Sequence, residues 1–207
     1  SVEKKVLGLI DEGKFVVTLG GEHSITTGPV RAHAARYKDL SVLQLDAHSD
    51  LRPEYEGSPY NHACVMSRVK EVCPCVQVGI RSMCSEEKPF VDDRTMFYAE
   101  DIVNGCDWIE RVVERLTDNV YVTIDLDVFD PAYLPATGTP EPGGLDWYKV
   151  TALLKAVCDR KNVVGFDVME LCPIKSLPAS DFLAAKLVYK FLTYKYTCAG
   201  SARKRSK

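Results

Sequence analysis

Apolar runs that alternate with helical patterns organise this chain from one end to the other. Runs rich in β-branched residues predict strands at 14–19, 40–46, 75–80, 95–98, 119–125 and 162–169. Apolar residues at helical spacing predict helices at 1–12, 24–37, 62–72, 107–117, 145–159 and 178–195. The strands are continuous apolar runs, as is typical when helices cover both faces of a sheet. The alternation therefore predicts an α/β fold, a doubly wound, mostly parallel sheet with helices on both faces.

Length and charge narrow the classes of function. The 207 residues fit a single domain over residues 1–200, followed by a basic tail at 201–207 that we expect to be disordered. The net charge of −3 provides no general basic field, so we expect no nucleic-acid partner. No apolar run is long enough to span a bilayer, and no signal-peptide pattern opens the chain. Eight cysteines without C-x-x-C spacing indicate free thiols, so we expect a cytoplasmic location without membrane association.

Polar motifs stand at the carboxyl ends of three predicted strands. Residues 46–50 (DAHSD) and 125–127 (DLD) end two of them, and residues 20–24 (GGEHS) follow a third. In extended backbone, residues i, i+2 and i+4 point to the same side. Open α/β sheets also place their sites outside the carboxyl ends of the strands. We therefore expect convergence of two imidazoles and four carboxylates: His23, His48, Asp46, Asp50, Asp125 and Asp127.

Such a set of side chains predicts a site for two metal ions. Four carboxylates crowded together would raise one another's pKa, whereas two divalent cations would balance their charge. Oxygen and imidazole ligands without thiolate favour Mn²⁺, Co²⁺ or Fe²⁺ over a structural zinc. The alternative is that these residues are ordinary helix caps and turn residues, which a single D-x-D motif would favour.

Two other candidate side chains are less informative. His33 lies in the middle of a predicted helix, and we expect it on the surface. Cys64 lies two residues after His62, but a nucleophilic cysteine needs a separate base that the sequence does not supply.

With these motifs in order, the chain resembles the ureohydrolases, the family of arginase and agmatinase. Further matching segments are 123–131 (TIDLDVFDP), 135–144 (PATGTPEPGG) and 167–170 (DVME), and the loop 50–68 is more similar to agmatinase. The resemblance implies an arginase-like three-layer α/β/α fold and a binuclear-metal hydrolase that acts on C–N bonds of linear amidines. Family members are longer at the N-terminus, so we expect this chain to lack their N-terminal segment.

The resemblance also implies an assignment of ligands to two Mn²⁺ ions. One ion would be held by His23, Asp46, Asp50 and Asp125, and the other by Asp46, His48, Asp125 and Asp127, with Asp46 and Asp125 bridging. It implies three catalytic side chains as well. Glu170 would pair with a guanidinium group, Asp50 would orient the attacking water and accept its proton, and His62 would protonate the leaving amine.

The expected reaction is hydrolysis of a small guanidino substrate, with agmatine giving putrescine and urea. The loop after the metal motif supplies Glu54 and Glu56, and acidic groups at the mouth would favour the agmatine dication over the arginine zwitterion. Arginase and hydrolases of other guanidino compounds remain alternatives, as does a non-catalytic or truncated relative. A zinc deacetylase is a weaker alternative, because the sequence has no His-His pair. The resemblance implies a homo-oligomer, either a trimer or a hexamer.

Overall fold

One six-stranded parallel sheet forms the centre of the molecule. The structure is a computed structural model that describes the backbone of residues 1–204 and the side chains of residues 1–197. The strands run in the order β1-β6-β5-β2-β3-β4, and each neighbouring pair is parallel. Their bounds are β1 Val16–Leu19, β2 Leu40–Leu45, β3 Cys75–Ile80, β4 Met96–Tyr98, β5 Asn119–Asp125 and β6 Asn162–Met169.

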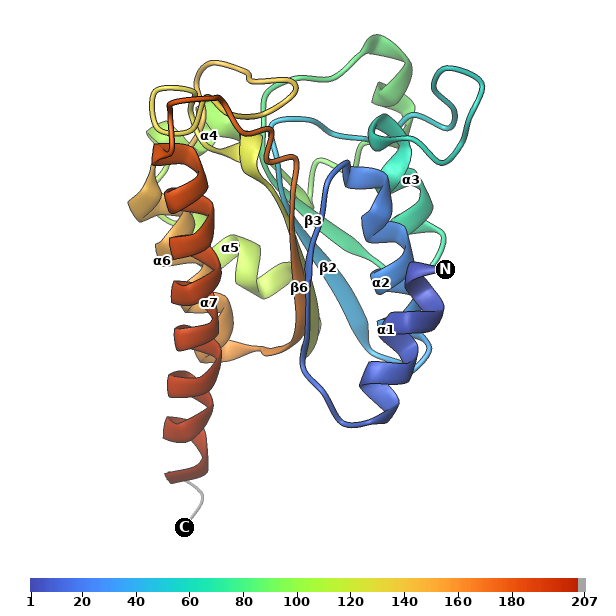
Figure 1. Ribbon diagram of the computed structural model, residues 1–207, viewed down its shortest axis with the longest axis vertical. Helices are drawn as coiled ribbons and strands as arrows, with labels where there is room; N and C mark the ends of the chain where they lie inside the picture. The colour runs from blue at the N-terminus through green and yellow to red at the C-terminus, as the bar shows by residue number, and fades with distance from the viewer. Residues whose placement is uncertain (205–207) are drawn as a thin grey trace.

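Helices cover both faces of this sheet (Figure 1). On one face lie α1 Val2–Asp11, α2 Thr27–Ala34 and α3 Val65–Lys70. On the other face lie α4 Ala99–Asn104, α5 Trp108–Arg115, α6 Trp147–Arg160 and α7 Ala179–Lys204. Short 3₁₀ turns follow several strands: η1 His23–Thr26, η2 His62–Cys64, η3 Ser85–Phe90 and η4 Leu126–Val128. The predicted doubly wound three-layer fold is confirmed. Within the described residues, no helix is long and apolar enough to span a membrane.

The main differences from the predicted elements lie at helix ends. The helix expected at 24–37 begins as the 3₁₀ turn η1 and ends at Ala34, and α4 was not predicted. Helix α7 continues past residue 195 to Lys204, so residues 201–204, which we expected in a disordered tail, have helical backbone. Residues 205–207 of that expected tail lie outside the described residues. Helix α6 begins where Asp146 accepts hydrogen bonds from the backbone N–H groups of Tyr148 and Lys149, an N-cap that satisfies two free donors.

Two apolar layers hold the helices against the sheet. The larger layer lies between the sheet and α5–α7, where the rings of Phe166 and Phe191 have centroids 4.5 Å apart. The second lies under α2 and α3 and includes Met66 and Tyr121, both completely buried. Burial of each large apolar side chain stabilises the fold by about 1.5–3 kcal/mol. These layers pack against both faces of the strands, which carry the polar motifs at their carboxyl ends.

Strand register brings the polar motifs to one level. Leu45 of β2 pairs with Ile124 of β5, so Asp46 and Asp125 leave adjacent strands side by side. Asp125 in turn pairs with Met169 of β6, the residue before Glu170. The carboxyl ends of four neighbouring strands, β1, β6, β5 and β2, therefore deliver the candidate site residues to one edge of the sheet.

Candidate metal centre and substrate cleft

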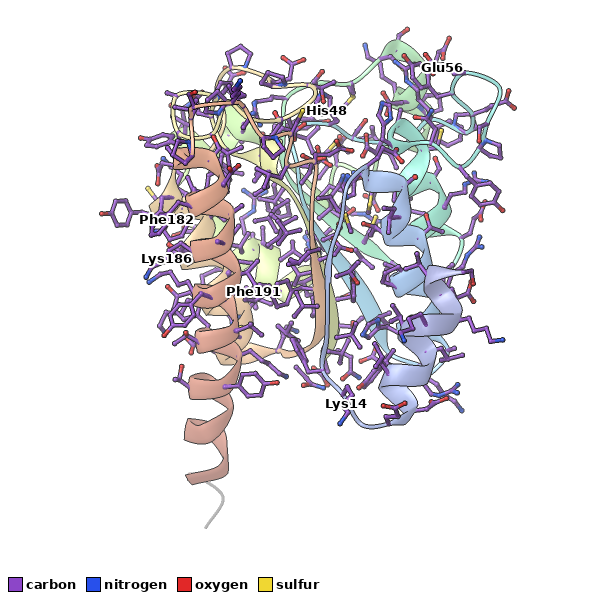
Figure 2. All side chains as sticks on the ribbon, in the orientation of Figure 1. Lys14, His48, Glu56, Phe182, Lys186 and Phe191 are labelled. Carbon is purple, nitrogen blue, oxygen red and sulfur yellow. The ribbon has the colours of Figure 1, made fainter. Side chains whose placement is uncertain are left out.

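The candidate ligands meet at the carboxyl edge of the sheet. Figure 2 shows His48 at this edge, at the opposite end of the molecule from Lys14. His23 is the first residue of η1 after β1, and Asp46 and His48 follow β2 directly. The side chain of His48 is about one quarter exposed, whereas those of Asp46 and Asp127 are completely or almost completely buried.

His23 presents one ring nitrogen to three carboxylates. Its Nδ1 lies 3.1 Å from Oδ2 of Asp46, 3.2 Å from Oδ2 of Asp50 and 3.3 Å from Oδ2 of Asp125. This nitrogen is buried, yet none of the three contacts has hydrogen-bond geometry. The other ring nitrogen, Nε2, is 2.8 Å from the Thr123 hydroxyl. A buried nitrogen that points between three carboxylate oxygens is better suited to coordinate a cation than to donate a hydrogen bond.

A second group forms around His48 and shares Asp46 with the first. Nδ1 of His48 lies 2.9 Å from Oδ2 of Asp127 and 3.6 Å from Oδ1 of Asp46. Within each of the groups His23–Asp46–Asp50 and Asp46–His48–Asp127, one ligand atom per residue lies within 4.8 Å of the others. Asp125 belongs to neither group by that measure, although it contacts His23. The structure thus brings all six predicted ligands together, with Asp46 common to both groups.

The electrostatics of the protein groups alone are strongly unbalanced. Burial would lower the pKa of His48, but the hydrogen bonds and charges of Asp127 and Asp46 outweigh it and raise the pKa to about 11. Burial raises the pKa of Asp50 to about 7, with the neighbouring Asp46 charge acting in the same direction. Burial and the charges of Asp127 and Asp46 raise the pKa of Asp125 well above its ordinary value. Two divalent cations would balance these four carboxylates, so the donor set and its charge fit a binuclear centre.

A cleft of about 470 Å³ opens above this cluster. Among its lining residues are His48, Asp50, His62, Asp125 and Glu170. Glu170 is half-buried, and its Oε1 accepts a hydrogen bond of 2.6 Å from the backbone N–H of His23. His62 lies at the mouth with its Nδ1 3.3 Å from Oε1 of Glu22. The three predicted catalytic side chains therefore line one cavity together with the ligands His48 and Asp125.

Two of these residues have strained backbone. Asp50 has φ 52° and Glu170 has φ 64°, in the left-handed region that favours glycine. Such conformations cost about 1–3 kcal/mol each, and they persist where the surrounding structure holds them. Both residues face the cleft, which is where strained backbone of this kind concentrates in enzymes.

The sequence profile of the arginase family matches residues 1–193. The chain belongs to the arginase family. The resemblance expected from the motifs is confirmed, including its closeness to agmatinase-type ureohydrolases.

Several relatives in the arginase family are similar over most of this chain. N(1)-aminopropylagmatine ureohydrolase of Synechocystis sp. is 43% identical over 190 residues, which are 89% of this chain and 62% of that protein. Agmatinase of Pyrococcus horikoshii is 40% identical over 174 residues, or 84% of this chain and 60% of that protein. The solved structure of agmatine ureohydrolase of Thermoplasma volcanium superposes with a TM-score of 0.85 at 36% identity, covering 97% of this chain and 69% of that one. The chain thus spans about 60% of the length of these two curated relatives.

Two expectations about individual residues need correction. His33 was expected on the surface, but it is 1% exposed, because its ring packs against Tyr121 and its Nδ1 lies 2.8 Å from the carbonyl oxygen of Pro29. Glu54 and Glu56 are exposed and do not line the cleft, although Tyr55 between them does. The cleft is lined instead by Glu22 and Glu87, two acidic side chains that belong to neither the predicted ligands nor the predicted catalytic residues.

Three buried polar residues beside the ligands were missed. Gln44 and Gln77 sit inside strands that we interpreted as purely apolar, and Glu87 lies in η3, which was not predicted. For Gln44 alone a signal existed, since a polar residue two positions before Asp46 points to the same side as that ligand, whereas Gln77 precedes no ligand in its own strand. For Glu87 the sequence carries no comparable signal.

Proposed function

We propose that this chain hydrolyses a guanidino compound to urea and an amine, with two Mn²⁺ ions as its cofactors. The observation that carries the proposal is that six imidazole and carboxylate ligands meet beneath a cleft, which Glu170 and His62 line together with three of those ligands. The relatives named agmatinase and aminopropylagmatine ureohydrolase support this class of reaction.

In this proposal the ligands divide between the two ions as the family resemblance implies. His23, Asp46, Asp50 and Asp125 would hold one ion, and Asp46, His48, Asp125 and Asp127 the other. A bound pair of divalent cations would lower the pKa of water towards 7, which would supply the nucleophile at neutral pH. The two oxygens of Asp46 face different imidazoles, which supports its bridging position.

The remaining steps fall to side chains of the cleft. Glu170 would bind the guanidinium group, which is planar and always charged and so matches a carboxylate. Its Oε1 is already fixed by the backbone of His23, so the carboxylate has a defined direction before substrate arrives. Asp50 would orient the attacking water and take its proton. His62, whose Nδ1 lies 3.3 Å from Oε1 of Glu22, would donate a proton to the leaving amine.

Two substrates are favoured by particular observations. Agmatine fits a cleft with several carboxylates, because its far end carries an ammonium group rather than a carboxylate. N(1)-aminopropylagmatine is the second candidate, because a relative that is 43% identical is named for it. Arg52 also lines the cleft, with its guanidinium 4.5 Å from the Tyr55 ring centroid, but its Nε lies 4.0 Å from Oε2 of Glu87, so a substrate carboxylate such as that of arginine would compete with Glu87 for it.

A urea-release assay with Mn²⁺-loaded protein tests the proposal. The panel contains agmatine, N(1)-aminopropylagmatine, arginine and 4-guanidinobutyrate, and metal content is measured on the same samples. We expect urea from the first two compounds, with a kcat/KM at least about tenfold above that for arginine. This ratio requires roughly 1.4 kcal/mol of differential transition-state binding. Protein that binds two ions per chain and releases urea from no compound would refute the proposal.

Two further expectations belong to the same proposal. A cytoplasmic location belongs to the proposal as well, since eight cysteines in 207 residues are too few for the disulfide scaffold of a small secreted domain. A trimer or hexamer remains an expectation from the family resemblance, which light scattering of the purified protein would test.

A further inference from the structure

The only two glutamines of the chain lie side by side beneath the metal cluster. Gln44 on β2 and Gln77 on β3 are paired in the sheet register, and they are 0% and 3% exposed. The residues around them in both strands are apolar, so packing alone would be satisfied by valine or leucine. Two amides buried at such positions are unfavourable unless every polar group has a partner.

Their side-chain amides hydrogen-bond to each other and to the segment 46–50, which carries the ligands Asp46, His48 and Asp50. Nε2 of Gln77 donates to Oε1 of Gln44 at 2.6 Å and to the carbonyl oxygen of Ser49 at 2.7 Å. Nε2 of Gln44 donates to Oδ2 of Asp46 at 2.7 Å and to the carbonyl oxygen of His48 at 3.3 Å. The pair thus contacts the segment 46–50 at one side chain and two carbonyl groups.

The order of donors and acceptors allows only one orientation of Gln44. If its amide were turned over, its oxygen would face the carboxylate oxygen of Asp46, and its nitrogen would face the nitrogen of Gln77. On the other side of the carboxylate, Oδ1 of Asp46 accepts a hydrogen bond of 2.6 Å from the backbone N–H of His48. The plane of the Asp46 carboxylate is therefore fixed from both sides.

We propose that Gln77 and Gln44 form a hydrogen-bond chain that positions Asp46, so that each of its oxygens faces one of the two metal ions. The inference rests on the proposed two-metal site. Both glutamines are positioning residues, because they act through Asp46 and touch neither substrate nor reacting atoms. Removal of a residue that orients a metal ligand typically weakens metal affinity by about 10–100-fold.

Gln44→Met and Gln77→Met test the chain, because methionine keeps the length of the side chain and removes its amide. Ser41→Ala is the matched control: Ser41 is also buried on β2, but its hydroxyl contacts Thr117 at the far end of the strand. The readouts are the Mn²⁺ dissociation constants by calorimetry and the visible absorption spectrum of the Co²⁺-loaded protein, which reports ligand geometry directly. Circular dichroism of metal-free protein confirms that each variant is folded.

We expect Gln44→Met to weaken Mn²⁺ binding about 10–100-fold and to change the Co²⁺ spectrum, with a smaller loss for Gln77→Met and none for Ser41→Ala. The double variant should lose less than the product of the two single losses, because Gln77 acts in part through Gln44. The proposal would be overturned if Gln44→Met left the Mn²⁺ affinity and the Co²⁺ spectrum unchanged. It would also be overturned if the effects of the two glutamines were independent, or if Ser41→Ala lost as much affinity as Gln44→Met. If Gln44→Met does not fold, an unchanged affinity and spectrum in Gln77→Met overturns it. Failure of the unsubstituted protein to bind two ions would instead refute the proposed function.

Discussion

Glu87 offers a sharp test of how the strained backbone at Asp50 is maintained. Glu87 is 4% exposed, and its Oε1 accepts hydrogen bonds from the hydroxyl of Ser49 at 2.6 Å and the backbone N–H of Leu51 at 2.8 Å. These two residues flank Asp50 on either side. Oε2 of Glu87 accepts a further bond of 2.7 Å from the backbone N–H of Cys84. One buried carboxylate therefore holds the chain before and after the left-handed residue.

The substitution Glu87→Gln keeps the shape of this side chain and removes its charge. The amide oxygen can still accept the bonds from Ser49 and Leu51, but the amide nitrogen then faces the N–H of Cys84, donor against donor. A hydrogen bond to a charged group contributes about 1.5–3 kcal/mol, and the two that remain become neutral and weaker. We therefore expect the free energy of unfolding of the metal-free protein to fall by about 2–4 kcal/mol. Because Asp50 is less firmly held, Mn²⁺ affinity should fall by at least about tenfold.

Urea denaturation measures the stability change, and calorimetry measures the Mn²⁺ affinity. The adjacent and exposed Glu86 supplies the matched control, since Glu86→Gln should change stability by less than about 0.5 kcal/mol. A stability loss with unchanged Mn²⁺ affinity would refute the link to Asp50, and no loss in either measurement would refute the whole argument.

Acid titration gives a second check on Glu87. Burial raises the pKa of this carboxyl, but the hydrogen bonds from Ser49, Cys84 and Leu51 outweigh it and bring the pKa below its ordinary value of 4.5. A lowered pKa in the folded state means that the stabilisation is present above pH 4.5 and is lost as the pH falls through the folded-state pKa. The stability difference between the unsubstituted protein and Glu87→Gln should therefore shrink below pH 4.5. A constant difference down to pH 2 would contradict this assignment.

Three further substitutions separate metal binding, proton transfer and packing. Asp125→Ala should lose bound metal as well as activity, because its carboxylate contacts His23 and would bridge both ions; two ions per chain by metal analysis would contradict this. His62→Asn should keep both ions and lose about 10²–10⁴ in urea-release rate, so loss of metal would contradict the proton-donor role. Gly165→Ala should destabilise the fold by about 1–3 kcal/mol in urea denaturation, because the added Cβ would lie 2.5 Å from Nε2 of the buried His33. Unchanged stability would show that the His33 ring can move.

Much of the fold and of the candidate site follows from local patterns in the sequence. Continuous apolar runs are typical of strands when both faces of a sheet are covered, and the strand 75–80 was predicted with its observed bounds. The ligands were found because their motifs follow strand ends, which a parallel sheet gathers at one edge. Asp46 and His48 needed only the alternation of side chains in extended backbone. Helix ends were less predictable, since α7 continues past the expected residue 195 with no proline or glycine to end it there.

The supports of the site depend instead on strand register, which no local pattern specifies. Thr18, Asp167, Thr123, Gln44 and Gln77 come from five different strands, yet the register places them in one row across the sheet. This row lies one pleat below the ligand level: Thr123 and Gln44 each precede a ligand by two residues, so side chains on the same face stack. From the row, Thr123 contacts His23 and Gln44 contacts Asp46. A parallel sheet can thus orient a metal centre with residues that look like isolated polar interruptions in the sequence, because the strand order assembles them beneath the ligands.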